Sequence, residues 1–182
     1  MKFQINEKTR WITTTAVFIA LLIAAQVVTA PFGQPVTGSL VNLILIVSVM
    51  VYGLSSGLTV ALISPIVAGI ISIGPTWAMV PFVMAGNAVI VSVWRFIGKK
   101  RFAPPLAVRV TALITAAICK FLVLYIGVVK IAAPYFLNLP EPQAAKITGM
   151  FSLPQLFTAL AGGAIAAIVI PLIEKARTAR AL

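Results

Sequence analysis

The hydrophobic positions of this chain are gathered into six long stretches, separated by short polar, proline-rich or glycine-rich segments. The stretches cover residues 11–30, 39–52, 58–73, 78–97, 106–129 and 149–173. Most of them approach the roughly 20 apolar residues that a helix needs to cross the hydrocarbon of a bilayer. The pattern predicts an all-α integral membrane protein, a six-transmembrane-helix bundle in which residues 1–182 form a single transmembrane domain.

Three segments depart from this simple pattern. Residues 39–52 are few for a straight crossing, Pro65 interrupts the third stretch, and residues 130–148 form the longest predicted loop. Residues 28–30 (Val-Thr-Ala) resemble the cleavage site of a signal peptide, which gives the first stretch a second interpretation. We favour a retained helix, because the apolar core is longer than that of a signal peptide and the remaining stretches are equally apolar.

The charged residues give the predicted bundle an orientation. The chain holds 14 Lys and Arg residues against 3 Asp and Glu residues, for a net charge of +11. Most of the basic residues lie within residues 2–10, 95–109 and 175–180. Because Lys and Arg collect on the cytoplasmic side of membrane proteins, both termini are predicted to be cytoplasmic in a multi-pass protein of the plasma membrane. No aromatic and basic surface accompanies the charge, so it does not indicate nucleic-acid binding.

The residue types that carry catalysis are scarce. The sequence has no His, a single Cys at position 119, and three acids, Glu7, Glu141 and Glu174, all near helix ends or in loops. It therefore lacks a carboxylate pair for acid–base chemistry, a Cys/His metal site and a phosphate-binding P-loop. We predict that the chain is not an enzyme and holds no cofactor, and that any uphill transport is driven by a partner.

A few polar residues lie inside the apolar stretches. Gln26, Asn42, Asn87, Lys120 and Gln155 fall in the outer half of their predicted spans or near the midplane, with Gln26 near the outer end of the first. Hydrogen bonding between helices is an alternative to ligand binding for each amide. Lys120 is costly at this depth, and no acidic residue in any span is available to pair with it. Its amine is either neutral, held by carbonyls and amides, or in contact with an anionic or strongly polar ligand.

Three aromatic residues lie at a similar depth. Trp77, Tyr125 and Phe151 offer flat apolar surfaces to a ring-bearing ligand, although anchoring at the membrane interface is an alternative for Trp77. Apolar walls with a few convergent polar groups are typical of ligand pockets. The predicted substrate-binding residues are Asn42, Trp77, Asn87, Lys120, Tyr125 and Gln155.

The first stretch carries a row of small residues. Ala16, Ala20 and Ala24 recur every four positions and therefore share one face of a helix. Small residues allow another helix to approach closely. The row predicts either packing within the chain or a docking face for a separate subunit.

Three motifs resemble those of a known family. They are Gly38-Ser39-Leu40-Val41-Asn42-Leu43, Gly74-Pro75-x-Trp77-x-x-x-Pro81-Phe82 followed by Gly86-Asn87-Ala88, and Phe151-Ser152-Leu153-Pro154-Gln155-Leu156 followed by Thr158-Ala159-Leu160-x-Gly162-Gly163. With the chain length, the six stretches and the alanine row, the likeness covers nearly the whole sequence. On these features the chain resembles the substrate-binding S components of energy-coupling factor (ECF) vitamin transporters.

The resemblance implies a function and a set of partners. An S component of an ECF-type ABC importer binds a water-soluble vitamin near the outer face of the membrane. It assembles with a transmembrane coupling subunit and two cytoplasmic ATPases, which hold the ATP and Mg²⁺. It is thought to topple in the membrane as it delivers its ligand inward. By this analogy Ala16, Ala20 and Ala24 face the coupling subunit.

The identity of the vitamin stays open at this point. Lys120 favours a carboxylate or phosphate, which makes pantothenate the first candidate. The small residues Gly86, Ala88, Gly162 and Gly163 allow a wide pocket, so cobalamin is the second. Pyridoxine or a hydroxymethylpyrimidine stacked on Trp77 is the third. The alternatives to an S component are a self-sufficient carrier or small channel, and a structural or assembly protein of the membrane.

Overall fold

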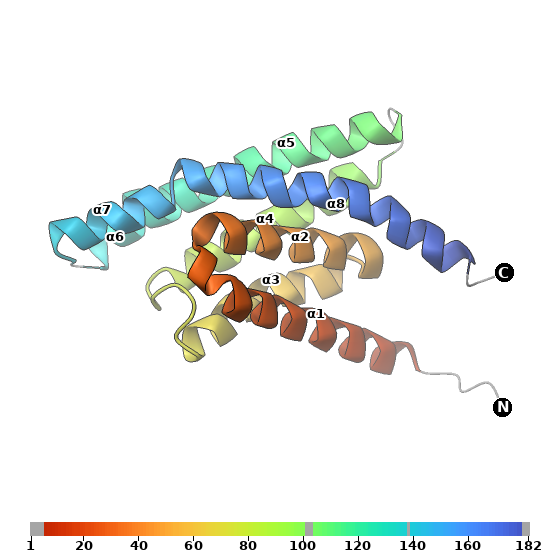
Figure 1. Cartoon of the computed structure of the whole chain (residues 1–182), viewed down its shortest axis with the longest axis horizontal. Coiled ribbons are helices and arrows are strands. Elements are labelled where there is room, and N and C mark those ends of the chain that lie inside the picture. Colours follow the sequence, from red (N-terminus) through yellow and green to blue (C-terminus); the bar gives the residue numbers. More distant parts are fainter. Residues whose placement is uncertain (1–5, 101–103, 138, 180–182) are drawn as a thin grey trace.

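The computed structural model describes residues 6–100, 104–137 and 139–179, and this part of the chain consists of helices and connecting turns without a β-strand. The helices are α1 (Glu7–Thr29), the 3₁₀ turn η1 (Ala30–Phe32), α2 (Gln34–Tyr52), α3 (Leu54–Ile70), α4 (Val80–Gly98), α5 (Pro105–Leu124), the π-helix η2 (Tyr125–Ala132), α6 (Ala133–Tyr135), α7 (Glu141–Met150) and α8 (Leu153–Ala179). Figure 1 shows that the long helices form one bundle.

The bundle is built around α2, which contacts α1, α3, α4 and α8, while α5 packs against α4 and α8. Leu45, Ile46 and Val49 of α2 are fully buried, and Trp94 of α4 belongs to the same hydrophobic cluster. The start of α1 and the end of α8 lie at one end of the bundle, and α6 and α7 lie at the other (Figure 1). The fold thereby defines two chemically different ends.

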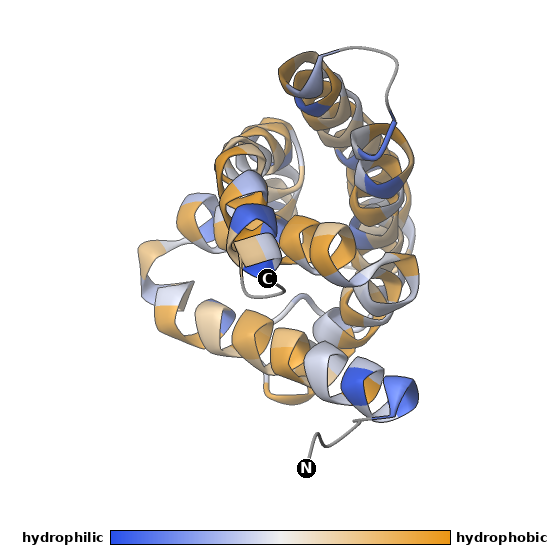
Figure 2. Cartoon of the chain, turned by 90° about the vertical axis from the view of Figure 1, so that its right-hand side faces the viewer, coloured by the Kyte–Doolittle hydropathy of each residue, from blue (hydrophilic) through white to orange (hydrophobic). Residues whose placement is uncertain are grey.

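The outer surface of the bundle is apolar. Val17, Ile118 and Ile168 are about half exposed or more, and they represent a large set of outward-facing apolar side chains on α1, α5 and α8. Figure 2 shows hydrophobic residues along most of each helix, with hydrophilic residues gathered mainly toward helix ends. An exposed apolar surface of this extent is unfavourable in water and suits lipid. The prediction of an all-α membrane bundle is confirmed.

Five helical segments are long and apolar enough to cross a membrane: Glu7–Phe32, Gln34–Tyr52, Val80–Gly98, Pro105–Tyr135 and Glu141–Ala179. The remaining predicted span, residues 58–73, corresponds to α3, which has 17 residues and ends at Ile70. It ends there because the backbone N–H groups of Ile73 and Gly74 both turn back to the carbonyl of Ala68. The chain therefore leaves the helix three residues earlier than the apolar pattern indicates.

Two predicted loops contain helix. The segment between the first two spans is largely helical, because α2 begins at Gln34 with Pro35 in its first turn, a position that suits proline. The segment over residues 130–148 contains the end of η2, α6 and the whole of α7, which follows Pro140. α6 and α7 lie at the end of the bundle away from the start of α1, and α7 borders the cavity described below through Ile147 and Met150.

The crossing of α2 and α8 depends on a glycine. A Cβ at Gly162 would overlap the backbone carbonyl of Ser39 and lie 2.8 Å from Cβ of Asn42. Gly162→Ala should therefore force the two helices apart and lower the free energy of unfolding by about 1–3 kcal/mol, as overpacked cores do. Thermal unfolding in detergent measures the change.

Gly149→Ala is the matched control for this substitution, because no neighbouring atom lies within 4 Å of the Cβ it would add. Alanine has the better helix propensity, so this variant should match the wild type or exceed its melting temperature slightly. A Gly162→Ala protein as stable as the Gly149→Ala protein would contradict the tight crossing.

Candidate substrate-binding site

A cavity of about 280 Å³ lies at the end of the bundle that carries α7. Its walls come from the end of α1, the start of α2, the end of α3, the turn before α4, and residues of α4, α5, α7 and α8. Its polar lining residues are Gln26, Gln34, Thr37, Asn42, Ser64, Thr76, Asn87, Lys120 and Gln155, and its larger apolar ones are Val41, Ile73, Met79, Val83, Leu124, Ile147, Met150 and Phe151. Segments from most of the length of the chain thus converge on one partly open cavity.

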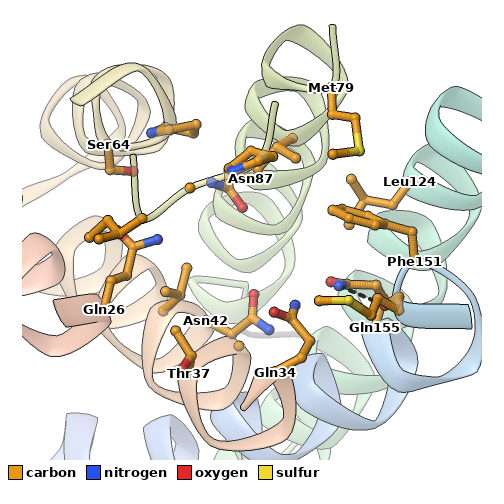
Figure 3. Close-up of a pocket in the computed structure, with 18 of the residues that line it drawn as sticks. Gln26, Gln34, Thr37, Asn42, Ser64, Met79, Asn87, Leu124, Phe151 and Gln155 are labelled. Carbon is orange, nitrogen blue, oxygen red and sulfur yellow. Dashed lines mark hydrogen bonds between the residues drawn. The ribbon is translucent and has the colours of Figure 1, made fainter. Parts of the chain in front are cut away.

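Lys120 and two asparagines form the polar centre of this cavity. The Nζ atom of Lys120 donates hydrogen bonds to Oδ1 of Asn42 at 2.6 Å and to Oδ1 of Asn87 at 2.8 Å. All three residues are almost completely buried, with exposed fractions of 3%, 1% and 2% for Lys120, Asn42 and Asn87. Figure 3 shows Asn42 and Asn87 entering the cavity from α2 and α4. Three helices therefore place their polar side chains at one point.

The bonding of this centre leaves hydrogen-bond donors free. A lysine ammonium carries three N–H groups and a carboxamide carries two, and an ammonium has no acceptor. Both asparagines must consequently turn their oxygen toward Lys120, which directs their NH₂ groups elsewhere. Within the described residues, no further partner is found for the third N–H of Lys120 or for either NH₂ group. The centre is thus suited to a ligand group that accepts hydrogen bonds.

No acidic side chain neutralises Lys120. Glu7, Glu141 and Glu174 are the only acids of the sequence, and none of them lines the cavity. Glu174 forms an ion pair with Lys99 at 3.3 Å, at the end of the bundle where α8 finishes. A buried cation is stable only with compensating interactions, so an anionic group in the cavity would complete the site.

We next compared the sequence with models of known protein families. Residues 10–174 match the model of the family described as ECF transporter, substrate-specific component. The chain belongs to this family. No curated protein and no solved structure gave a match. The protein is therefore an S component, a multi-pass membrane subunit that binds a small molecule and works with a coupling component and ATPases.

Gln155 lies at the edge of the cavity in this S component. Its Nε2 donates to the carbonyl of Met150 at 3.2 Å, which ties the first turn of α8 to the end of α7. The residue is 4% exposed, and no side chain or backbone group of the described residues donates to its Oε1. Asn42, Asn87, Lys120 and Gln155, all predicted from sequence, are thus brought together.

Two other predicted site residues lie outside the cavity lining. Trp77 is 59% exposed, and its ring packs against Gly69 of α3. Tyr125 opens the π-helix, where its ring lies next to Phe121 with centroids 5.7 Å apart. Phe151 does line the cavity and is 9% exposed. Of the three aromatics considered from the sequence, the structure therefore places one at the site.

Several lining residues were not among the predicted substrate-binding residues: Gln26 was noted only as a polar residue near the outer end of the first span, and Ser64, Met79 and Leu124 were not considered. Gln26 and Ser64, from α1 and α3, lie on one side of the cavity, and Met79 and Leu124 lie on another (Figure 3). Leu124 is detectable in principle, because it follows Lys120 by four residues and must share its helix face. Serine in an apolar span gives no such signal, since it normally bonds to its own helix.

The alanine row of α1 lies on the outside of the bundle. Ala16, Ala20 and Ala24 are all exposed, whereas Thr15 and Leu22 of the same helix are buried. The row therefore does not pack against other helices of the described chain. The three small side chains thus face outward, next to the larger exposed side chains of Val17 and Leu21.

Proposed function

We propose that this S component captures a small water-soluble vitamin in the cavity around Lys120, from the outer side of the membrane. It then delivers the vitamin inward by reorienting against a coupling subunit, driven by two partner ATPases. The observation that carries this proposal is the cavity whose buried centre, Lys120 with Asn42 and Asn87, retains unused hydrogen-bond donors.

The orientation is inferred from the charges at the two ends of the bundle. The basic residues that gather at the end opposite the cavity are Lys8, Arg10, Arg95, Lys99, Lys100, Arg109, Lys175 and Arg177. Basic residues next to membrane spans favour the cytoplasmic side. We therefore assign both termini to the cytoplasm and the cavity to the outer half of the membrane.

The size of the cavity ranks the candidate vitamins. Its volume of about 280 Å³ lies near the lower end of the ~300–1,000 Å³ that is common for ligand pockets. Pantothenate, pyridoxine and a hydroxymethylpyrimidine are of a suitable size. A cobalamin, with its corrin ring and nucleotide loop, is several times larger, so we place it last. The charge of Lys120 keeps pantothenate first.

The partner surface is assigned to α1. The outward-facing row of Ala16, Ala20 and Ala24 allows close approach of another helix, which suits a contact that slides as the S component reorients. ATP and Mg²⁺ are assigned to the partner ATPases, because the sequence holds no phosphate-binding loop.

A thermal-shift screen of the purified chain against water-soluble vitamins tests the proposal. A ligand present at 100 times its dissociation constant should stabilise the protein by about 2.7 kcal/mol. One vitamin, or one group of related vitamins, should raise the melting temperature while the others leave it unchanged. If no vitamin stabilises the chain, it does not capture its substrate alone and the proposal is wrong.

A further inference from the structure

Two polar atoms of the cavity wall have no hydrogen-bond partner in the described protein. They are Oε1 of Gln26 and Oγ of Ser64, and both atoms are buried. The residues come from α1 and α3, line the same cavity and lie on the same side of it (Figure 3). Buried polar groups without partners are rare and costly, so these two call for a specific explanation.

Ser64 differs from other helical hydroxyl groups of this chain. Ser39 donates to the carbonyl of Pro35 at 2.6 Å, Ser48 to Leu45 at 2.7 Å and Thr59 to Ser55 at 2.9 Å. This local bond is the usual way in which a serine or threonine satisfies itself inside an apolar helix. Ser64 is 1% exposed and makes no such bond. Its hydroxyl is directed toward the cavity (Figure 3).

The two polar parts of the cavity have different hydrogen-bonding properties. Lys120, Asn42 and Asn87 leave only N–H donors free, and Lys120 is the one basic residue among the residues that line the cavity. Gln26 offers an unpaired carbonyl oxygen, which accepts, beside its NH₂ group, which donates, and Ser64 offers a hydroxyl, which does both. The apolar side chains of Met79, Leu124 and Phe151 form another part of the wall. The unpaired oxygens of Gln26 and Ser64 both accept, so a ligand with an acceptor at one end and a donor at the other matches both parts of the cavity.

We infer that the ligand is a small organic anion held at both ends. Its carboxylate accepts from Lys120, Asn42 and Asn87, and a hydroxyl or amide N–H at its other end donates to Gln26 and bonds to Ser64. The inference rests on the proposed function, since it names the substrate class of the same cavity. It makes Gln26 and Ser64 specificity-determining residues, and it supplies the negative charge that the protein does not place beside Lys120.

Pairs of ligands that differ only in charge test the first half of the inference. The probes are pantothenate with panthenol, nicotinate with nicotinamide, and biotin with biotinamide, together with uncharged riboflavin and cationic thiamine. The carboxylate member of one pair should bind about 10- to 100-fold more tightly than its neutral partner, because a charge-assisted hydrogen bond is lost. A neutral or cationic probe that binds as tightly as any carboxylate would overturn the inference while leaving the proposed function intact. If neither these probes nor any vitamin of the wider thermal-shift screen binds, the proposed function itself fails; a response from a non-carboxylate vitamin alone overturns only the inference.

Removal of single side-chain groups tests the second half. Ser64→Ala and Gln26→Leu should each weaken binding of the responding carboxylate by about 3- to 10-fold. Ser48→Ala is the control, because Ser48 is equally buried but bonds to its own helix and does not line the cavity.

A stability measurement separates ligand recognition from a structural role of Ser64. Without ligand, Ser64→Ala should melt at the same temperature as the wild type or higher, because it removes an unsatisfied hydroxyl. Ser48→Ala should not be stabilised. Unchanged affinity in both Ser64→Ala and Gln26→Leu would remove these residues from the ligand site and overturn the two-ended arrangement.

Discussion

Lys120→Met is expected to weaken binding of the vitamin by about 10- to 150-fold, the loss associated with one hydrogen bond to a charged group. Methionine keeps most of the length and the apolar stem of lysine, so the helix packing of α5 is preserved. It removes the cation and the remaining N–H donor that face the ligand. Titration of the detergent-purified protein by calorimetry, with the vitamin that responds in the thermal-shift screen, measures the change.

Lys130→Met is the control for this experiment. Lys130 follows Lys120 in the same continuous helical segment but is exposed, with its Nζ 5.6 Å from the centre of the Tyr125 ring and outside the cavity lining. Its replacement should leave the affinity unchanged. Equal affinities for wild type and Lys120→Met would show that the buried lysine does not contact the ligand, and the site would have to lie elsewhere.

Ala20→Trp is expected to prevent assembly with the coupling subunit while ligand binding stays at the wild-type level. Ala20 lies in the middle of the exposed alanine row of α1, away from the cavity lining. An indole ring at this position would hold an approaching helix at a distance and remove the close contact that small residues permit. Co-purification of the tagged S component with its partners, together with vitamin titration of the variant alone, measures both effects.

The control replaces an exposed residue on another helix. Ile118 of α5 is 46% exposed, and Ile118→Trp adds similar bulk at a surface that we assign to lipid. This variant should assemble as the wild type does. If Ala16→Trp and Ala20→Trp both still co-purify with the partners, the docking surface is not the alanine row.

The sequence was sufficient to select the residues at the centre of the candidate site, because their side chains are unusual in membrane spans. A lysine without an acidic partner, and two amides in apolar spans, stand out by their cost in a membrane. The sequence did not predict that these side chains contact one another, because that depends on how α2, α4 and α5 pack. Gln155 was also recognisable by its chemistry, and the structure places it beside Met150 at the rim.

Other parts of the site required the structure. Tyr125 follows Lys120 by five residues, which turns it about 140° away on a helix, so periodicity disfavours it as a neighbour of the lysine. Trp77 lies in a turn, where no periodicity applies. Ser64 is inconspicuous in sequence, and only its missing hydrogen bond identifies it.

The apolar pattern predicted the long helices of the bundle. It did not predict the helix that lies next to the cavity within residues 130–148. Residues 130–148 are polar and rich in proline, which is typical of loops, yet they include α7. Proline is tolerated in the first turn of a helix, and Pro142 occupies that position in α7. In the π-helix η2, Gly127 packs against Phe82. No sequence pattern predicts such a contact.

The central claim is that this S component captures its vitamin by itself but moves it across the membrane only with its partners. The most direct test is uptake of the radiolabelled vitamin into lipid vesicles that contain the chain alone, or the chain with its coupling subunit and ATPases. The account predicts saturable binding of one vitamin per chain without accumulation in the first case, and ATP-dependent accumulation in the second. Sustained accumulation by vesicles that contain the chain alone would contradict it and would identify a self-sufficient carrier.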